Sequence, residues 1–194
     1  LGPDGPSLGG FVCPAVVVDA ELWKLGQLRP GDTVRFHRLS LDQALDRSAM
    51  VEAALATLRQ TLPAAPADDA QAHSTPIVLA DPAREDEAVP AMVVRQAGDR
   101  YLLVEFGPLV LDIELRLRVH VLMQALQARI AAGTLPGIVD MTPGIRSLQL
   151  HFDPSKVSRA ELLNVLVEAE AALPAVDDME VPSRIVHLPL SWDD

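Results

Sequence analysis

The sequence predicts an α+β protein with two joined parts: a β-rich N-terminal part that ends in a helix, and a β-α-β-β-α-β domain of the ferredoxin-like kind. Three observations lead to this prediction. Apolar residues make up 49% of the 194 residues, which is enough to build a core. Prolines and acidic residues interrupt the apolar pattern over residues 63–92. After that stretch, short alternating runs and helical periodicity follow one another.

The N-terminal part begins with loop composition, since residues 1–14 are rich in glycine and proline. The β-branched run at 15–19 predicts a short strand, and residues 22–27 predict a helical turn. A tight turn is expected at Pro30-Gly31, because proline presets φ and glycine accepts a positive φ. Alternation of apolar and polar residues predicts a second strand over 33–39.

A helix is predicted over residues 41–61. Ser40 suits the N-cap, and Gln43 completes a capping box three residues later. One apolar stripe follows the helical spacing, and it consists of Val51, Leu55, Leu58 and Leu62. Pro63 is expected to end the helix, because proline lacks the backbone N–H that a helix needs. Residues 1–62 are therefore expected to form the first domain.

Residues 63–92 are predicted to be a linker that is mostly without fixed structure. This stretch contains five prolines, many alanines, and six acidic residues against one basic residue, Arg84. Such a composition buries too little apolar surface to offset the entropy of folding. We therefore expect the boundary between the two parts of the chain to lie here.

The first half of the second domain is predicted to contain two strands and a long helix. The strands, at 91–95 and 100–106, flank a turn at Gly98-Asp99. Apolar residues at helical spacing predict a helix over 111–131, and Gly133 is expected to cap its C-terminus.

The second half is predicted to contain a hairpin, a helix and a last strand. Strands at 138–141 and 147–152 flank a turn at 142–144. Ser158 opens a helix through a second capping box, and a strand follows over 184–190.

This order predicts a four-stranded antiparallel sheet with both helices on one face. We expect residues 93–183 to be one α+β domain and residues 184–194 to carry its last strand.

The charge balance excludes several classes of partner. The net charge is −11 and the sequence pI is about 4.8, which argues against nucleic acid and anionic membranes as partners.

No apolar run is long enough to span a membrane, and no signal peptide is visible. The single cysteine, Cys13, excludes an internal disulfide framework and a cysteine-based zinc site. It is interpreted as a small buried hydrophobe rather than a nucleophile. A cytoplasmic location is expected.

The sequence contains none of the common phosphate-binding or hydrolase motifs. It lacks the G-x-x-x-x-G-K-[ST] and G-x-G-x-x-G patterns, the G-x-S-x-G elbow and H-E-x-x-H. No two of its five histidines are spaced three or four residues apart on one predicted helix, so no metal site is expected. Catalytic residues stay unassigned.

A loop between the two strands of the second hairpin is the best local candidate for binding. It places Thr142, Arg146 and Ser147 at the end of the predicted sheet, where a guanidinium and backbone N–H groups can hold an anion. The alternative interpretation is a plain turn whose hydroxyls satisfy local backbone groups. Gly9 and Gly10 allow the close approach of a ligand or another backbone, and paired glycines also simply make turns.

Several stretches together resemble a known pair of domains. The C-terminal end of the KipA-like (allophanate hydrolase subunit 2-like) domain is similar to residues 5–14, 19–27 and 29–36. The N-terminal part of the KipI-like (subunit 1-like) domain is similar to residues 101–107, 140–153 and 184–194. These domains stand in this order in the carboxyltransferase region of the urea carboxylase (urea amidolyase) family.

The resemblance implies a function for the parent protein. Such an enzyme uses ATP and bicarbonate to make carboxybiotin, and then moves the carboxyl group to urea to give allophanate. The implied partners are the biotin carboxylase and biotin carrier domains of the same parent chain, with urea as substrate. Substrate contacts are expected between the two halves, and the residues favoured for them are Gly9, Gly10, Thr142, Arg146 and Ser147.

The resemblance also implies that this chain is a piece of a longer polypeptide. It begins without Met and stops after residues 184–194, where a cyclophilin-like barrel is expected to follow. The piece is expected to be inactive alone. One alternative is a component of a 5-oxoprolinase, which opens a lactam ring with ATP. The other is a KipI-like regulatory protein that inhibits a kinase.

Overall fold

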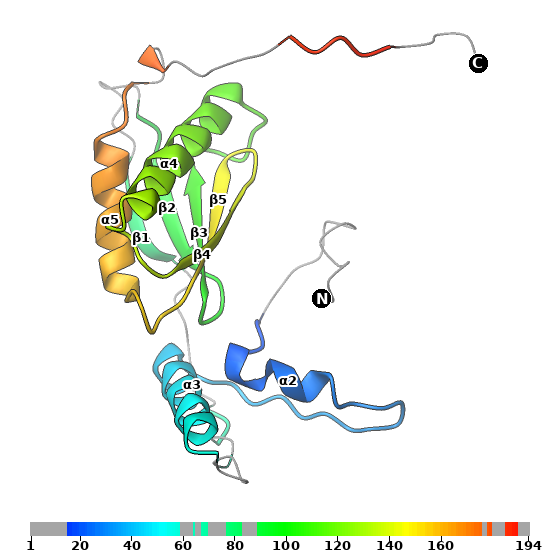
Figure 1. The fold of residues 1–194 in the computed structure, drawn as a ribbon. Coiled ribbons are helices and arrows are strands. Elements are labelled where there is room, and N and C mark those ends of the chain that lie inside the picture. The colour runs from blue at the N-terminus through cyan, green and yellow to red at the C-terminus, as the bar shows by residue number, and fades with distance from the viewer. Residues whose placement is uncertain are drawn as a thin grey trace, which may run out of the picture.

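Two lobes make up the described part of the protein (Figure 1). The computed structural model describes residues 15–58, 64, 67–69, 77–82, 89–175, 178–179 and 185–189. We call residues 15–58 the helical lobe. Residues 77–82 and 89–175 form the sheet domain.

The helical lobe contains three helices: η1 (Asp19–Glu21), α2 (Leu22–Leu25) and α3 (Leu41–Ala56). The predicted capping box at the start of α3 is confirmed. The Ser40 hydroxyl accepts the Gln43 N–H at 3.2 Å, and the Gln43 side chain accepts the Ser40 N–H at 2.9 Å. Both donors would otherwise be left without a partner in the first turn of the helix.

The helix α3 ends five residues earlier than predicted. The Thr57 hydroxyl donates to the Ala53 carbonyl at 2.8 Å, and Leu58 adopts a positive φ of 50°. A hydroxyl that bonds the preceding turn and a left-handed residue both end helical geometry. Pro63, which was predicted to end the helix, lies outside the described residues.

The two strands predicted in the N-terminal part do not form. Residues 15–18 and 32–40 have no strand assignment, and Asp19 already belongs to η1. A single extended segment without a paired neighbour leaves its backbone groups to water and is not stable as a strand. The tight turn is confirmed: the Asp32 N–H donates to the Arg29 carbonyl at 3.0 Å, and Gly31 has φ +97°.

The sheet domain contains a five-stranded antiparallel sheet with the order β1-β2-β3-β5-β4. Its strands are β1 (Ile77–Asp81), β2 (Met92–Gln96), β3 (Tyr101–Phe106), β4 (Ile138–Pro143) and β5 (Ser147–Phe152). The turn at Gly98-Asp99 joins β2 to β3, as predicted.

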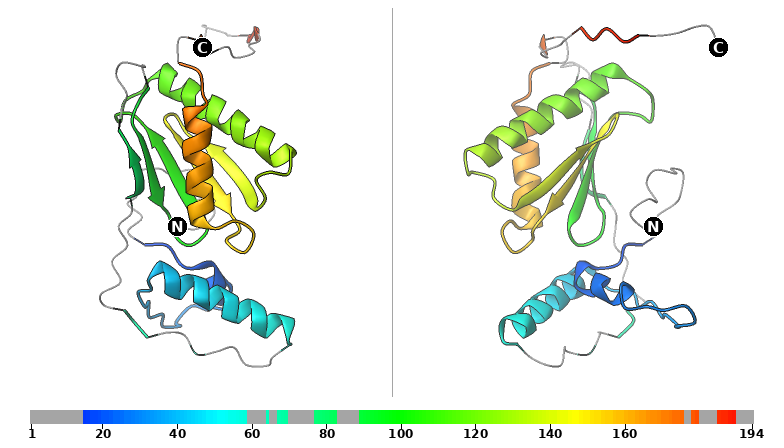
Figure 2. Two further views of the ribbon diagram at one scale, coloured as in Figure 1. Left: turned by 90° about the vertical axis from the view of Figure 1, so that its left-hand side faces the viewer. Right: turned by 45° about the vertical axis from the view of Figure 1, so that its right-hand side comes forward.

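Two helices, α4 (Ile113–Ala131) and α5 (Arg159–Ala171), pack on one face of this sheet (Figure 2). Alternate strand residues point toward them, which gives one buried face and one uncovered face. The core on the buried face includes Val94, Leu102, Val104, Phe106, Leu148, Leu150 and Phe152. Gly133, with φ +72°, caps α4 as predicted, and the Thr134 N–H reaches back to the Arg129 carbonyl at 3.0 Å.

The α+β class and the β-α-β-β-α part of the prediction are confirmed, but the edges of the sheet differ. The predicted last strand, 184–190, is not part of the sheet: its described residues, 185–189, have no strand assignment and are exposed. β2 occupies that side of β3 instead. Pairing with β2, which a short turn joins to β3, costs less loop-closure entropy than pairing with a strand about eighty residues away.

The predicted linker also contributes to the sheet. Residues 77–81, placed within the stretch predicted to be without fixed structure, form β1 and pair with β2. Val78 and Leu79 pack against the core, which supplies the apolar burial that average composition concealed. The division of the chain into domains at 1–62, 63–92, 93–183 and 184–194 stays a prediction.

A buried ion pair joins the two helices of the sheet domain. Arg118 on α4 pairs with Glu170 on α5, and both side chains are only 1% exposed. Arg118 also donates to the Pro174 carbonyl at 3.1 Å. Removing one partner of such a pair leaves an uncompensated buried charge, so the pair fixes how the helices meet.

Substituting Glu170→Gln is expected to lower the free energy of unfolding by about 3–5 kcal/mol, because Arg118 would keep its buried charge without a counterion. Glu168→Gln is the matched control. This variant removes the exposed ion pair between Glu168 Oε2 and Arg129 Nη1, which are 3.3 Å apart. It should lower the free energy of unfolding by at most about 1 kcal/mol. Guanidinium chloride denaturation followed by circular dichroism measures both. Equal midpoints for the two variants would contradict this account.

Candidate functional site

The turn between β2 and β3 carries the contact between the two lobes. We call Gly98, Asp99 and Arg100 the joint. The Asp99 side chain is buried, with 5% of the residue exposed, and its Oδ2 accepts the backbone N–H of Asp19 at 3.1 Å. Asp19 opens η1 in the helical lobe, where a free N–H needs an acceptor. The sheet domain therefore caps the first helix of the other lobe.

Arg100 adds charge to the same contact. Its guanidinium faces three carboxylates: Asp19 at 2.9 Å, and Glu52 and Asp153 each at 4.0 Å. Asp19 and Glu52 belong to the helical lobe, while Asp153 follows β5 in the sheet domain. One half-buried cation thus holds together three anions that would otherwise repel each other.

Gly98 allows the lobes to approach closely. It has φ +77°, and a Cβ added to it would lie 2.8 Å from a methyl carbon of Val16. Any side chain there would strain the backbone and push the helical lobe away from the turn.

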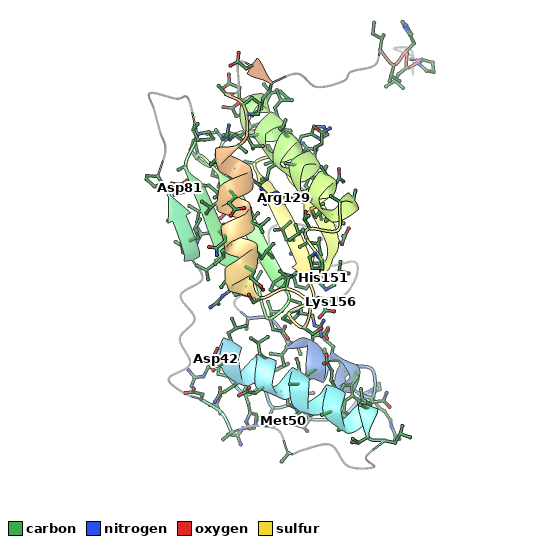
Figure 3. All side chains as sticks on the ribbon, turned by 60° about the vertical axis from the view of Figure 1, so that its left-hand side comes forward. Asp42, Met50, Asp81, Arg129, His151 and Lys156 are labelled. Carbon is green, nitrogen blue, oxygen red and sulfur yellow. The ribbon has the colours of Figure 1, made fainter. Side chains whose placement is uncertain are left out.

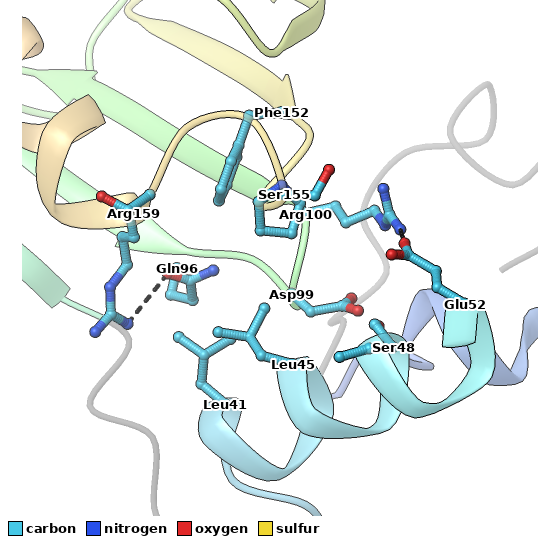
Figure 4. Close-up of a pocket in the computed structure, with 13 residues that line it drawn as sticks. Leu41, Leu45, Ser48, Glu52, Gln96, Asp99, Arg100, Phe152, Ser155 and Arg159 are labelled. Carbon is cyan, nitrogen blue, oxygen red and sulfur yellow. Dashed lines mark hydrogen bonds and ion pairs between the residues drawn. The ribbon is translucent and has the colours of Figure 1, made fainter. Parts of the chain in front are cut away.

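A cavity of about 240 Å3 lies beside the joint, between α3 and the sheet domain (Figure 4). Leu41 and Leu45 line it from α3, and Phe152 lines it from the end of β5. Arg159 and Gln96 close one side, where the guanidinium donates to the amide oxygen at 3.4 Å. The cavity is mainly apolar with polar groups at its margins, which suits it to small molecules that are only partly polar.

Thr142, Arg146 and Ser147, three of the predicted binding residues, lie at the opposite end of the sheet. Thr142 is in β4 rather than in a turn, because it pairs with Gln149 across the ladder. The turn is made by residues 144–146, and the Gly144 N–H donates to the Ser147 carbonyl at 2.7 Å. Proline at the next position of β4 is tolerated because β4 is an edge strand. The predicted turn at 142–144 is therefore wrong by two residues.

Arg146 is held by a carboxylate and by backbone carbonyls. Its guanidinium contacts Glu105 at 2.6 Å and donates to the Gly107 carbonyl at 3.2 Å. Arg95 binds the other oxygen of Glu105 at 2.5 Å. Two guanidiniums share one carboxylate, so this cluster keeps an excess positive charge on the uncovered face of the sheet.

The structure brings together some of the predicted residues and leaves others untested. Arg146 and Ser147 are neighbours at the start of β5, and the Thr142 hydroxyl points to Asp140 at 3.4 Å. Gly9 and Gly10 lie outside the described residues, as does Cys13. The sequence indicates only a turn at Gly98-Asp99, and no local pattern links Asp19 to Asp99, so neither the joint nor the cavity could be predicted from it.

Within the described residues, none of the helices is long and apolar enough to cross a membrane. In the same residues, no group of three or more histidine, cysteine, aspartate or glutamate side chains is arranged to hold a metal ion.

Two family models match this chain on either side of α3. The model for the carboxyltransferase domain, subdomain C and D, matches residues 92–194, and the model for subdomain A and B matches residues 1–38. The first match covers more than half of the chain. The chain belongs to the carboxyltransferase domain family. The contacts of the joint cross from one match to the other, since Asp19 falls in the first segment and Asp99 and Arg100 fall in the second.

Curated relatives of this carboxyltransferase chain are much longer proteins. Urea amidolyase of Saccharomyces cerevisiae is 39% identical over 98% of this chain, which covers 10% of that protein. A putative urea carboxylase of Emericella nidulans is 31% identical over 98% of this chain, which covers 17% of it. The chain thus spans about a tenth to a sixth of the length of these relatives.

A crystal structure of Kluyveromyces lactis urea carboxylase is similar to this chain. It is 37% identical and covers 84% of this chain and 14% of its own, with a TM-score of 0.72. Urea amidolyase of the same organism gives the same score. The likeness therefore covers most of this chain.

Asp153, which faces Arg100, is held in its charged form. The Ser155 hydroxyl and N–H donate to its carboxylate at 2.7 and 3.0 Å, and Lys156 lies 3.2 Å away. These contacts, first the Ser155 hydroxyl, lower the pKa of Asp153 from 3.8 to about 2. Figure 3 shows Lys156 at the end of the sheet domain that faces the helical lobe.

Substituting Ser155→Ala is expected to raise the pKa of Asp153 toward 3.8, because the hydroxyl bond favours the carboxylate. The native pKa is depressed, so its contribution to stability is present above about pH 4 and is lost as pH falls toward 2. Carbon-13 NMR of the side-chain carboxyl as a function of pH measures the pKa. The same value in both proteins would refute the assigned cause.

Proposed function

We propose that this chain is part of the carboxyltransferase region of a biotin-dependent urea carboxylase, where a carboxyl group passes from carboxybiotin to urea to give allophanate. The observation that carries the proposal is the similarity over 98% of the chain to proteins named urea amidolyase and urea carboxylase. The likeness of 84% of the chain to a urea carboxylase crystal structure supports it further. In this proposal the chain supplies the end of subdomains A and B, the connection, and subdomain C.

The rest of the reaction belongs to other parts of the parent protein. A biotin carboxylase domain uses ATP and bicarbonate, and a carrier domain bears the biotin. The parent is then a cytoplasmic ligase, and this piece alone is inactive because it lacks those domains. Carboxybiotin supplies the carboxyl group, and urea supplies the nitrogen that binds it.

Within this reaction, we assign binding rather than catalysis to residues of this chain. The transferred carboxylate and the ureido oxygen are hydrogen-bond acceptors, which fit the excess positive charge of Arg95 and Arg146 around Glu105. Thr142 on β4 and Ser147 on β5 offer hydroxyls on the same face of the sheet. Gly9 and Gly10 are proposed to let backbone approach the ligand.

Full-length parent protein is expected to hydrolyse ATP faster when urea is added with bicarbonate, and only when it is biotinylated. The two alternatives give different results. Stimulation by 5-oxoproline instead of urea would favour a 5-oxoprolinase component. No turnover with either substrate, together with a stable complex with a histidine kinase, would favour a regulatory protein. A coupled assay for ADP release compares both substrates directly.

Substituting Arg146→Ala in the parent should lower kcat/KM for urea by about 10- to 100-fold, the usual value of a hydrogen bond to a charged group. Arg129→Ala is the control, because Arg129 pairs only with surface Glu168 among the contacts described. Arg146 also ties β5 to Gly107, so the denaturation midpoint of both variants must be measured. Unchanged kcat/KM in a folded Arg146→Ala protein would contradict the assignment.

A further inference from the structure

We infer that Arg100 is a positioning residue for carboxyl transfer, because it fixes subdomains A and B against subdomain C through the joint. This inference rests on the proposed function. Its structural basis is the set of contacts that cross from one family match to the other, at Gly98, Asp99 and Arg100.

The covalent connection between the lobes does not by itself set their orientation. In sequence, seven residues lie between Asp69, whose N–H donates to the Arg38 carbonyl of the helical lobe at 3.0 Å, and the start of β1 at Ile77. A connection of that length reaches many relative placements of its ends. The orientation must therefore come from contacts across the interface, and the joint supplies a partly buried hydrogen bond and an ion-pair cluster there.

The ion pairs described for the Arg100 guanidinium, within 4.0 Å, are all with carboxylates. Asp19 and Glu52 face it from the helical lobe, and Asp153 faces it from the sheet domain (Figure 4 shows Arg100 with Glu52). Lys156 lies on the far side of Asp153 as its second partner. Removing the guanidinium turns a net attraction across the interface into repulsion between carboxylates of the two lobes.

A shift of the lobes has a large effect on a reaction that needs groups from both sides. Misplacement of about 1 Å costs about 100-fold in rate when reacting groups are held by different elements. The biotin carboxylation step takes place in another domain, so it should not depend on the joint. Arg100 is thus expected to affect the transfer step selectively.

The test uses the full-length parent with Arg100→Ala, Arg100→Lys, Asp19→Ala, and Arg100→Ala with Asp19→Ala. We expect Arg100→Ala to lower kcat for urea-dependent turnover by about 10- to 100-fold with little change in KM for ATP. Arg100→Lys should recover part of this loss, because it keeps the charge but not the planar fork. The double variant should be no worse than Arg100→Ala, since both changes remove one shared contact.

Two further measurements separate positioning from folding. The first is biotin carboxylation without urea, which should stay within about twofold of the native rate in every variant. The second is hydrogen exchange of residues 15–25 and 41–56, which should quicken in Arg100→Ala while α4 and α5 are unchanged. Arg129→Ala, an arginine paired within subdomain C, should alter none of these readouts.

The outcomes distinguish this inference from the proposed function. If the native parent shows no urea-dependent turnover but Arg100→Ala still loosens the helical lobe, the joint stands and the proposed function fails. If urea turnover is normal in Arg100→Ala, or if it falls together with biotin carboxylation, Arg100 is not a positioning residue for transfer.

Discussion

The carboxylate of Asp99 accepts a backbone N–H from the other lobe, and the arrangement of the protein depends on this contact. Asp99 reaches Asp19 only because Gly98 adopts a positive φ at the tip of the β2–β3 hairpin. The hairpin is held in place because β3 pairs on both sides, with β2 and with β5. A buried carboxylate must find donors, so the contact constrains the lobes more than an apolar patch would.

The sheet carries different chemistry on its two faces. The helix-covered face is filled by apolar residues and closed by the Arg118–Glu170 pair. The uncovered face holds Arg95, Glu105 and Arg146, together with a Tyr101 ring stacked on His151 at 4.4 Å between centroids. Because alternate residues of a strand point to opposite faces, one pattern of alternation produces both the core and the candidate binding surface.

Local patterns predicted the elements that local physics decides. Capping boxes at Ser40 and Ser158 and the glycine cap after α4 are where the sequence placed them. The strands at 15–19 and 33–39 were wrong because alternation does not show whether a partner strand exists. β1 was missed because a composition rich in proline and acids hid the short run 77–81, which pairs with β2.

The candidate binding residues stay a prediction, and only part of their surroundings could be predicted from the sequence. Arg146 and Ser147 were chosen from residue type and place, but Glu105, the ion-pair partner of Arg146, lies 41 positions away from it in sequence. The joint depends on residues 80 positions apart, Asp19 and Asp99, and no spacing rule connects them. Family membership explains why the two segments meet, since they belong to different subdomains of one carboxyltransferase region.

Hydrogen exchange of the Asp19 amide tests most directly that the joint holds the lobes together. In the native protein this N–H donates to the buried Asp99 carboxylate at 3.1 Å, so the account predicts that it is protected from exchange. In Asp99→Ala the Asp19 amide should lose this protection, while the amides of α4 and α5 should exchange as in the native protein. Equal protection of Asp19 in the two proteins would contradict the account.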